Sequence, residues 1–143
     1  MLHDFYFEVV DTNVHLMCIN TEHKNQVLPY VLSLMYTTEN NDTLGKFFCI
    51  TQGGTELSLF VPDCIAKNVL QMLSGYLSSF TEKYTVLRVF QDTHMIEESG
   101  VVTQISKFFA ERNIPILYVN SFNNNYVLVR ETDQHVLDEF IEY

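Results

Sequence analysis

Ser99 and Gly100 are the residues whose types and position best suit binding chemistry, because they stand at the predicted start of a helix. The first four N–H groups of a helix lack partners within it, and glycine lets a ligand approach the backbone closely. The helix dipole adds a field that favours an anion. The pair therefore predicts a site for a carboxylate, such as that of a free amino acid. The alternative is that Ser99 is an ordinary helix cap and Gly100 an ordinary turn residue.

Acidic residues precede this helix, and an asparagine-rich turn follows it further along the chain. Asp92, Glu97 and Glu98 could attract a cationic side chain, or they could form a solvated loop. The three asparagines at 123–125 suit left-handed turn positions, which explains them without a function. Phe122, at the tip of the same turn, is either core-facing or an anchor for a partner.

The sequence contains no catalytic or metal-binding motif. The histidines are scattered, and neither an HxxxH nor a CxxC spacing offers a zinc site. GxSxG, P-loop and GxGxxG motifs are also absent, and Gly53-Gly54 fits a bare hairpin turn. We therefore expect a protein that is not an enzyme and that uses no metal and no cofactor. The histidines are His3, His15, His23, His94 and His135.

The formal net charge of −10, from 18 acidic and 8 basic residues, limits the classes of partner. Nucleic-acid binders and proteins on anionic membranes rely on basic residues, so both classes are disfavoured. A basic partner or a cationic ligand would be attracted. Acidity that only keeps the protein dispersed explains the charge equally well.

The cysteines and the N-terminus bear on the compartment. Cys18, Cys49 and Cys64 lie in or beside apolar runs without ligand spacing, which is typical of free thiols in the cytosol. The first residues, 1–4, lack the basic start and apolar stretch of a signal peptide. No segment approaches the roughly 18–20 uninterrupted apolar residues of a membrane helix. We therefore expect a cytoplasmic protein.

Hydrophobic periodicity predicts strands and helices in each half of the chain. The first half has predicted strands at 5–10, 14–19, 46–51 and 56–61, and helices that begin at Asn25 or Gln26 and at Pro62. Its first two strands are either a hairpin or one bent strand, and residues 76–83 form a link. The second half has predicted strands at 84–90, 114–121 and 126–131, and helices at 100–112 and after the cap Thr132.

The two halves repeat one order with one spacing. Residues 46–61 match 116–130, with an offset of 70 before the turn (46 to 116) and 69 after it (57 to 126). A fixed internal period indicates duplication, although strand–turn–strand–helix patterns also arise by chance. We predict an α+β fold of tandem ferredoxin-like βαββα units, with antiparallel sheets covered by helices on one face. The predicted units are 1–77, with an extra N-terminal strand, and 78–143.

The segment from Gly100 to Asp133 resembles the ACT domain family. Its helix start Gly100-Val101-Val102, the run 110–116, Asn120-Ser121-Phe122 and the strand 126–131 resemble, more narrowly, the variant found in CASTOR-type cytosolic arginine sensors. The resemblance covers about residues 12–142. It implies a pair of ACT units that binds an amino acid at an interface between units and equals half of such a sensor. A homodimer would restore the four units.

The resemblance also implies which residues carry the function. The strand edge 113–116 would lie near the helix start and hold an α-amino group, and the aromatic turn would contact a regulatory protein partner. The family has Asp where this chain has Asn125, and a neutral amide lacks the charge that a guanidinium favours. The ligand is then arginine or a neutral amino acid; the alternatives are a ligand-free interaction module and a detached regulatory subunit of an enzyme. The implied ligand-binding residues are Ser99, Gly100, Val101, Val102, Asn113, Ile114, Pro115, Ile116 and Asn125, and the implied partner-binding residues are Phe122, Asn123 and Asn125.

Overall fold

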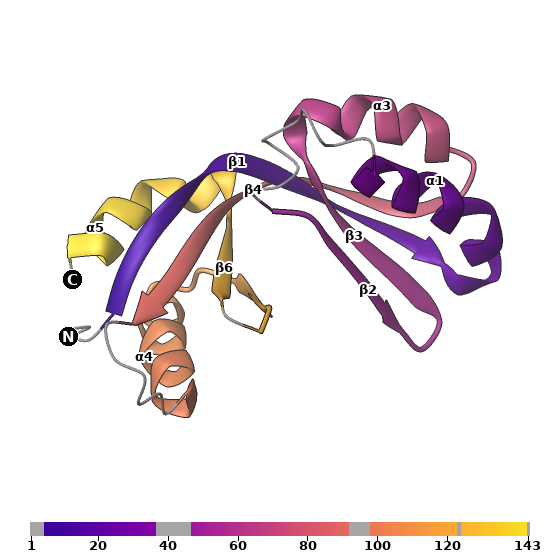
Figure 1. Ribbon diagram of the computed structural model, residues 1–143. Helices are drawn as coiled ribbons and strands as arrows, with labels where there is room; N and C mark the ends of the chain where they lie inside the picture. Colours follow the sequence, from indigo (N-terminus) through magenta and orange to yellow (C-terminus); the bar gives the residue numbers. More distant parts are fainter. Residues whose placement is uncertain (1–4, 37–46, 92–97, 123, 143) are drawn as a thin grey trace. The chain divides into compact units, whose positions relative to one another are not determined.

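The computed structural model of the chain describes residues 5–36, 47–91, 98–122 and 124–142 (Figure 1). Short 3-10 segments, η1 and η3, lead into two of the helices. The elements are β1 (Phe5–Asn20), η1 (Thr21–His23), α1 (Lys24–Tyr36), β2 (Cys49–Gly53), β3 (Glu56–Pro62), α3 (Asp63–Leu73), β4 (Leu77–Gln91), α4 (Glu98–Glu111), β5 (Ile116–Asn120), β6 (Asn125–Arg130), η3 (Glu131–Val136) and α5 (Leu137–Glu142).

The chain divides into two compact units, which we name by their order. The first unit is Asp11–Lys83, and the second unit is Tyr84–Tyr143 together with Met1–Val10. The first unit has the chain order βαββαβ. The second has the order βαββα and takes its remaining strand from the beginning of β1. Strands β1 and β4 therefore contribute residues to both units.

The first unit places its helices on one face of its strands (Figure 1). Its strand order is β2-β3-β1-β4, and β3 is antiparallel to β2 and to β1. Because side chains alternate along a strand, every second residue of β1 and β3 turns to the helices. These residues form one buried cluster with α1 and α3: Met17, Ile19, Val27, Val31, Leu57, Leu59, Val61, Ala66, Val69 and Leu73.

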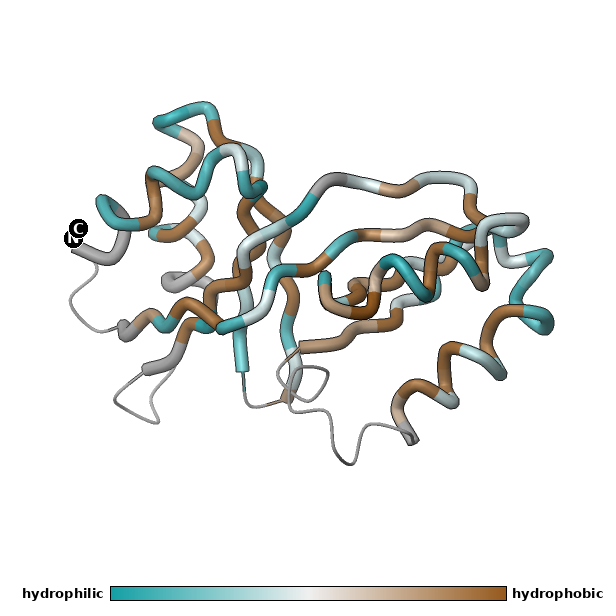
Figure 2. Tube along the Cα trace, turned by 90° about the horizontal axis from the view of Figure 1, so that it is seen from above, coloured by the Kyte–Doolittle hydropathy of each residue, from teal (hydrophilic) through white to brown (hydrophobic). Residues whose placement is uncertain are grey.

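The second unit repeats this plan with different core residues. Its strand order is β1-β4-β6-β5, and β6 is antiparallel to β4 and to β5. Figure 2 shows hydrophobic positions recurring along the strands and helices of each unit. The buried cluster of the second unit is Leu87, Val89, Ile105, Phe108, Phe109, Val127, Val129, Val136 and Leu137.

These observations confirm the α+β class, the ferredoxin-like order and the one-sided helical layer. The predicted link at 76–83 is wrong, because Leu77–Gln91 is one strand. Its polar beginning is held by side chains: the Ser78 hydroxyl donates to the Cys18 carbonyl at 3.1 Å. The predicted division after residue 77 therefore differs from the compact units, whose boundary follows Lys83 and which join residues 1–10 to the second half.

Several predicted boundaries also differ. Phe5–Asn20 is one strand, so the hairpin alternative is wrong. The residue that caps the last helical segment is Arg130 rather than Thr132, which lies inside η3. Helix α1 begins at Lys24, directly after η1, one or two residues earlier than predicted.

Candidate functional site

The predicted carboxylate site lies in the first turn of α4. This helix begins at Glu98, so Ser99 and Gly100 are its second and third residues, and Ser99 is not the cap. Their backbone N–H groups still belong to the first four of the helix, which lack intrahelical partners. Of the acidic residues considered above, Glu98 falls inside α4, while Asp92 and Glu97 lie outside the described residues. The start of α4 therefore coincides with the predicted residues, and binding of an anion there stays a prediction.

The other half of the predicted ligand site, Asn113–Ile116, ends the same helix. Asn113 has a φ of 57°, in the left-handed region. Its N–H donates to the Ala110 carbonyl at 3.0 Å, and the Ile114 N–H donates to the Phe109 carbonyl at 3.0 Å. This pair of bonds is a Schellman cap, and Ile114 packs against the cluster that contains Phe109, a contact that often accompanies such caps. The residue type and conformation of Asn113 are thus explained by helix termination.

A charged contact fixes this end of α4 further. Arg112 Nη2 lies 2.6 Å from Glu139 Oε1 of α5, and the Arg112 guanidinium carbon lies 3.6 Å from the centre of the Phe108 ring. The hydrogen bond from Arg112 holds the pKa of Glu139 below its ordinary value. The Arg112 side chain and the backbone N–H groups of residues 112–114 are therefore already engaged at the end of α4.

The structure separates the two halves of the predicted site. Ser99 and Asn113 are fourteen positions apart, and nearly all of the segment between them is the helix α4. A helix rises 1.5 Å per residue, so the two residues lie roughly 20 Å apart. One amino acid cannot contact both ends within one unit. Strand β5 begins just after Asn113 and runs back along the unit, so the turn after Asn120 lies at the opposite end from Asn113.

Asn125 belongs with the start of α4 rather than with Asn113. It is the first residue of β6, opposite Asn120 of β5 and Val89 of β4. Val89 is close to the end of β4, from which the chain proceeds to α4. The structure therefore groups the first turn of α4 with Asn125 at one end of the second unit, and leaves Asn113–Ile116 at the other.

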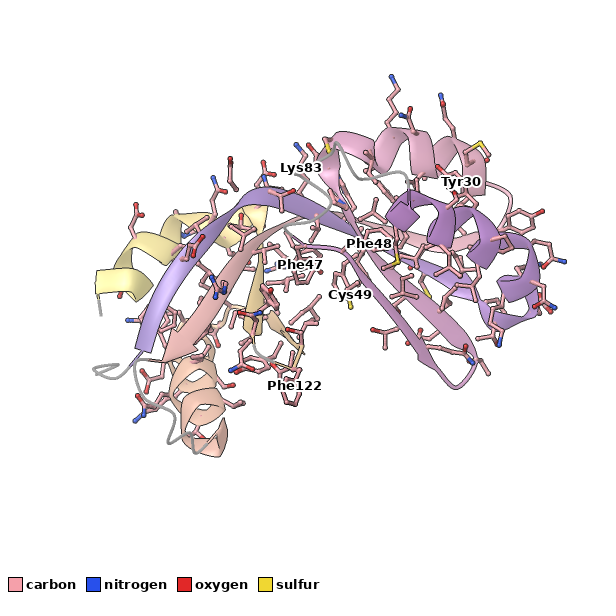
Figure 3. The ribbon with its side chains drawn as sticks, in the orientation of Figure 1. Tyr30, Phe47, Phe48, Cys49, Lys83 and Phe122 are labelled. Atoms are coloured by element: carbon pink, nitrogen blue, oxygen red, sulfur yellow. The ribbon has the colours of Figure 1, made fainter. Side chains whose placement is uncertain are left out.

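The turn between β5 and β6 presents Phe122 to solvent. Its side chain is 99% exposed and is labelled in Figure 3, so the core-facing alternative is wrong. The turn is closed by the Ser121 N–H, which donates to the Asn124 carbonyl at 2.8 Å. Asn123 lies outside the described residues.

Sequence reasoning missed the residues that hold this turn. Arg88 of β4 donates from Nε to Oδ1 of Asn124 at 2.8 Å, and its Nη1 lies 3.5 Å from Oε2 of Glu8 on β1. A signal was available: Arg88 is the one charged residue within the apolar run 86–90. A lone arginine in such a strand indicates a specific polar partner.

The described residues show little that suits metal chemistry or membrane insertion. Within 5–36, 47–91, 98–122 and 124–142, no group of three or more His, Cys, Asp or Glu residues could hold a metal ion. In the same part of the chain, no helix combines the length and hydrophobicity needed to cross a bilayer.

Residues 79–135 match the family model of the ACT domain. The matched range includes α4, β5, β6 and nearly all of β4, which are the elements that carry the first turn of α4, Asn125 and Phe122. No curated protein matches the chain.

Solved structures share the whole fold. A protein of unknown function from Vibrio cholerae, described as a possible transport protein, aligns with a TM-score of 0.65 at 13% identity, over 98% of this chain and 92% of its own. The regulatory subunit of aspartate kinase from Thermus thermophilus aligns with a TM-score of 0.59 at 9% identity, over 97% and 95%. An allosteric aspartate kinase from Clostridium acetobutylicum aligns with a TM-score of 0.63 at 15% identity; this chain spans 33% of its length. The fold is therefore ACT-like, of the kind found in regulatory parts of aspartate kinases.

Proposed function

We propose that the chain is a non-catalytic regulatory protein that binds a free amino acid at the end of the second unit where α4 begins, and that it acts as a homodimer. The observation that carries the proposal is the ACT-domain match over residues 79–135, which covers that end of the unit. The resemblance to CASTOR-type sensors supports the same class of ligand. The aspartate kinases with this fold include an allosteric enzyme and a separate regulatory subunit.

The chemistry at the start of α4 fits the two charged groups of an amino acid. N–H groups of the first turn, which have no partner within the helix, would receive the carboxylate, aided by the helix dipole. Glu98, whose backbone belongs to the same turn, is an acidic residue, and a negative charge favours an α-ammonium group. Asn125 supplies a neutral amide for the ligand side chain, which suits a neutral amino acid better than arginine. A ligand controls a regulatory protein only through its different affinity for two states, and the homodimer supplies such states.

The test is isothermal titration calorimetry with each proteinogenic amino acid at up to millimolar concentration. We expect one or a few to bind the wild type. Gly100→Leu should abolish binding, because leucine keeps the helix but fills the space a carboxylate would occupy. Pro115→Ala, an exposed position at the far end of α4, is the matched control and should bind normally. Absence of binding by every amino acid would refute the proposal.

A ligand-free protein–protein interaction module is the second candidate, and one observation favours it. Phe122 is 99% exposed on a turn that Arg88 and Ser121 hold in place. A fully exposed aromatic side chain next to hydrogen-bonded turn residues is typical of an interface anchor. Capture of a stable partner by the wild type but not by Phe122→Ala would support this function. Met72→Ala, which removes another exposed apolar side chain (60%) from the first unit, should leave capture unchanged.

A further inference from the structure

His15 of β1 lies where three elements of the first unit meet. Its Nε2 is 2.7 Å from Oδ1 of Asp63, the first residue of α3, and its Nδ1 is 3.1 Å from the carbonyl oxygen of Thr81 on β4. The His15 side chain is only 11% exposed. Its ring stacks on Phe80, with centroids 5.0 Å apart and planes 16° apart. The imidazole therefore links β1 directly to both α3 and β4.

Hydroxyl groups strengthen the same attachment of β4 to β1. The Leu16 N–H donates to the Thr81 hydroxyl oxygen at 3.0 Å, and that hydroxyl lies 3.2 Å from the Leu16 carbonyl. Further along, the Ser78 hydroxyl donates to the Cys18 carbonyl at 3.1 Å. Side chains thus provide part of the hydrogen bonding between these two strands. The attachment of β4 to β1 therefore depends here on a few side-chain groups: the His15 ring and the Thr81 and Ser78 hydroxyls.

Both atoms that face the imidazole are hydrogen-bond acceptors. A carbonyl oxygen such as that of Thr81 only accepts, and so does an ionised carboxylate. Asp63 is held ionised, since its hydrogen bond with His15 and, after that, its contact with Lys83 lower its pKa. Lys83, labelled in Figure 3, has its Nζ 3.4 Å from the second carboxylate oxygen, Oδ2. Two bonds from His15 to two acceptors require a proton on each ring nitrogen.

We propose that His15 and Asp63 form a proton-operated clasp that fastens α3 and the Leu77–Lys83 part of β4 to β1 while His15 carries both ring protons. This inference concerns the first unit and does not depend on amino-acid binding by the second. When one proton leaves, a nitrogen lone pair faces an oxygen at hydrogen-bond distance, and one of the two bonds is lost.

The other groups around His15 do not replace that proton. Asp63 from α3 and Lys83 from β4 are the charged groups that face it in the described residues. The residue of β3 that lies opposite His15 is Val61, and its side chain is apolar. After deprotonation Asp63 stays ionised beside Lys83 and the Thr81 carbonyl is still an acceptor, so one of the two ring nitrogens faces an oxygen with no proton between them.

The sign of the pH dependence follows. The folded state binds the doubly protonated imidazole, so the contribution of the clasp is present at lower pH and is lost at higher pH, once one ring nitrogen has given up its proton. In strong acid the clasp is lost for the opposite reason, because Asp63 becomes neutral. The clasp is therefore fastened in a window between these limits and opens above it.

Amide hydrogen exchange followed by mass spectrometry tests the clasp, with rates corrected for intrinsic exchange. Between about pH 5.5 and 8.5, protection of the peptide 77–83 should fall by about three- to tenfold more than that of the β6 peptide 125–130, because one charge-assisted bond is lost. His15→Gln should abolish the difference. His23→Gln is the matched control, since His23 pairs with Glu22 on the surface at 3.3 Å, and it should retain the difference.

Equal profiles for wild type and His15→Gln would overturn the proposal. If His15→Gln fails to fold, the nitrogen-15 spectrum of the wild-type ring decides. Two protonated nitrogens on His15 at pH 6 support the clasp, and a single protonated nitrogen refutes it.

Discussion

The two units follow the same order of elements, but their last helical segments differ. Pro62 and Arg130, which precede these segments, have almost the same backbone angles, −54° and 140° against −56° and 141°. In the first unit the chain continues as an α-helix, Asp63–Leu73. In the second it forms the 3-10 segment η3 before α5.

Charge pairing accompanies this difference. Asp63 reaches across to His15 of β1, so the first unit ties its helix to distant strands. Asp133 instead pairs with Arg130, three residues earlier, with Nη2 to Oδ2 at 2.8 Å. A 3-10 helix aligns residues three apart, so this local pair fits η3. The shared order therefore determines the layers, whereas each unit has its own polar contacts.

The largest expected effect concerns the cores. Phe108 and Phe109 meet edge to face within the buried cluster of the second unit, with centroids 5.2 Å apart, whereas the buried edge-to-face pair of the first unit, Phe47 and Phe60, lies outside the cluster under α1 and α3, with centroids 6.2 Å apart. Phe109→Ala should lower the free energy of unfolding by about 3–5 kcal/mol, because it leaves a cavity under α4. Urea denaturation followed by circular dichroism measures the loss. Phe122→Ala, the same change at an exposed phenylalanine, should cost less than about 0.5 kcal/mol; comparable losses would contradict the assignment of Phe109 to the core.

The next effect sharpens the functional contrast between the two ends of α4. Asn125→Asp should shift ligand preference toward arginine by about tenfold relative to a neutral amino acid, because a carboxylate can pair with a guanidinium. Competition calorimetry with arginine and the preferred neutral amino acid measures the ratio. Asn113→Asp is the same change at the other end of the helix and should leave the ratio unaltered. If Asn113→Asp alone changed it, the ligand site would lie at the wrong end.

Sequence reasoning succeeded where a pattern is local and repeated. The alternation in 56–61 and 126–131 located β3 and β6, and the spacing of Ile105, Phe108 and Phe109 identified the buried face of α4. It failed at β4, because Ser78 and Thr81 act through bonds to β1, some sixty residues away. No local periodicity signals such contacts.

The site was predicted only in part for a similar reason. The start of α4 is visible in the sequence because Gly100 stands at a helix start, and Phe122 is visible as an aromatic in a turn. The distance between Ser99 and Asn113 follows from helix geometry once the helix is known to run unbroken from Glu98 to Glu111. The hydrogen bond from Arg88 to Asn124 connects β4 with the turn before β6, and these segments become neighbours only in the folded sheet.

A smaller effect distinguishes how α4 of the second unit and α3 of the first unit end. Asn113 is left-handed at the end of α4, whereas Ser74 after α3 is right-handed, with a φ of −54°. Asn113→Ala should cost about 1 kcal/mol, since alanine tolerates the left-handed region poorly, while Asn113→Gly should cost nothing. Ser74→Ala should change stability by less than about 0.5 kcal/mol. Thermal denaturation of the three variants tests this; equal losses for both alanine variants would show that backbone conformation is not the cause.

The smallest expected effect concerns the acid dependence of stability. Each unit has a carboxyl group whose pKa is lowered in the folded state. The pKa of Asp63 is lowered chiefly by its hydrogen bond with His15, and the pKa of Glu139 is lowered chiefly by its hydrogen bond with Arg112. A carboxyl group whose folded pKa is depressed contributes stability above its unfolded value, about 3.9 for Asp and 4.3 for Glu, and loses it as pH falls through the folded value. Asp63→Asn should therefore flatten the loss of stability on acidification below about pH 5. Glu139→Gln should flatten it less, because solvent screens the exposed Arg112–Glu139 pair more strongly. Urea titrations at a series of pH values compare the two slopes, and a larger change for Glu139→Gln would mean that the long-range contact of the first unit is weaker than the pair between α4 and α5.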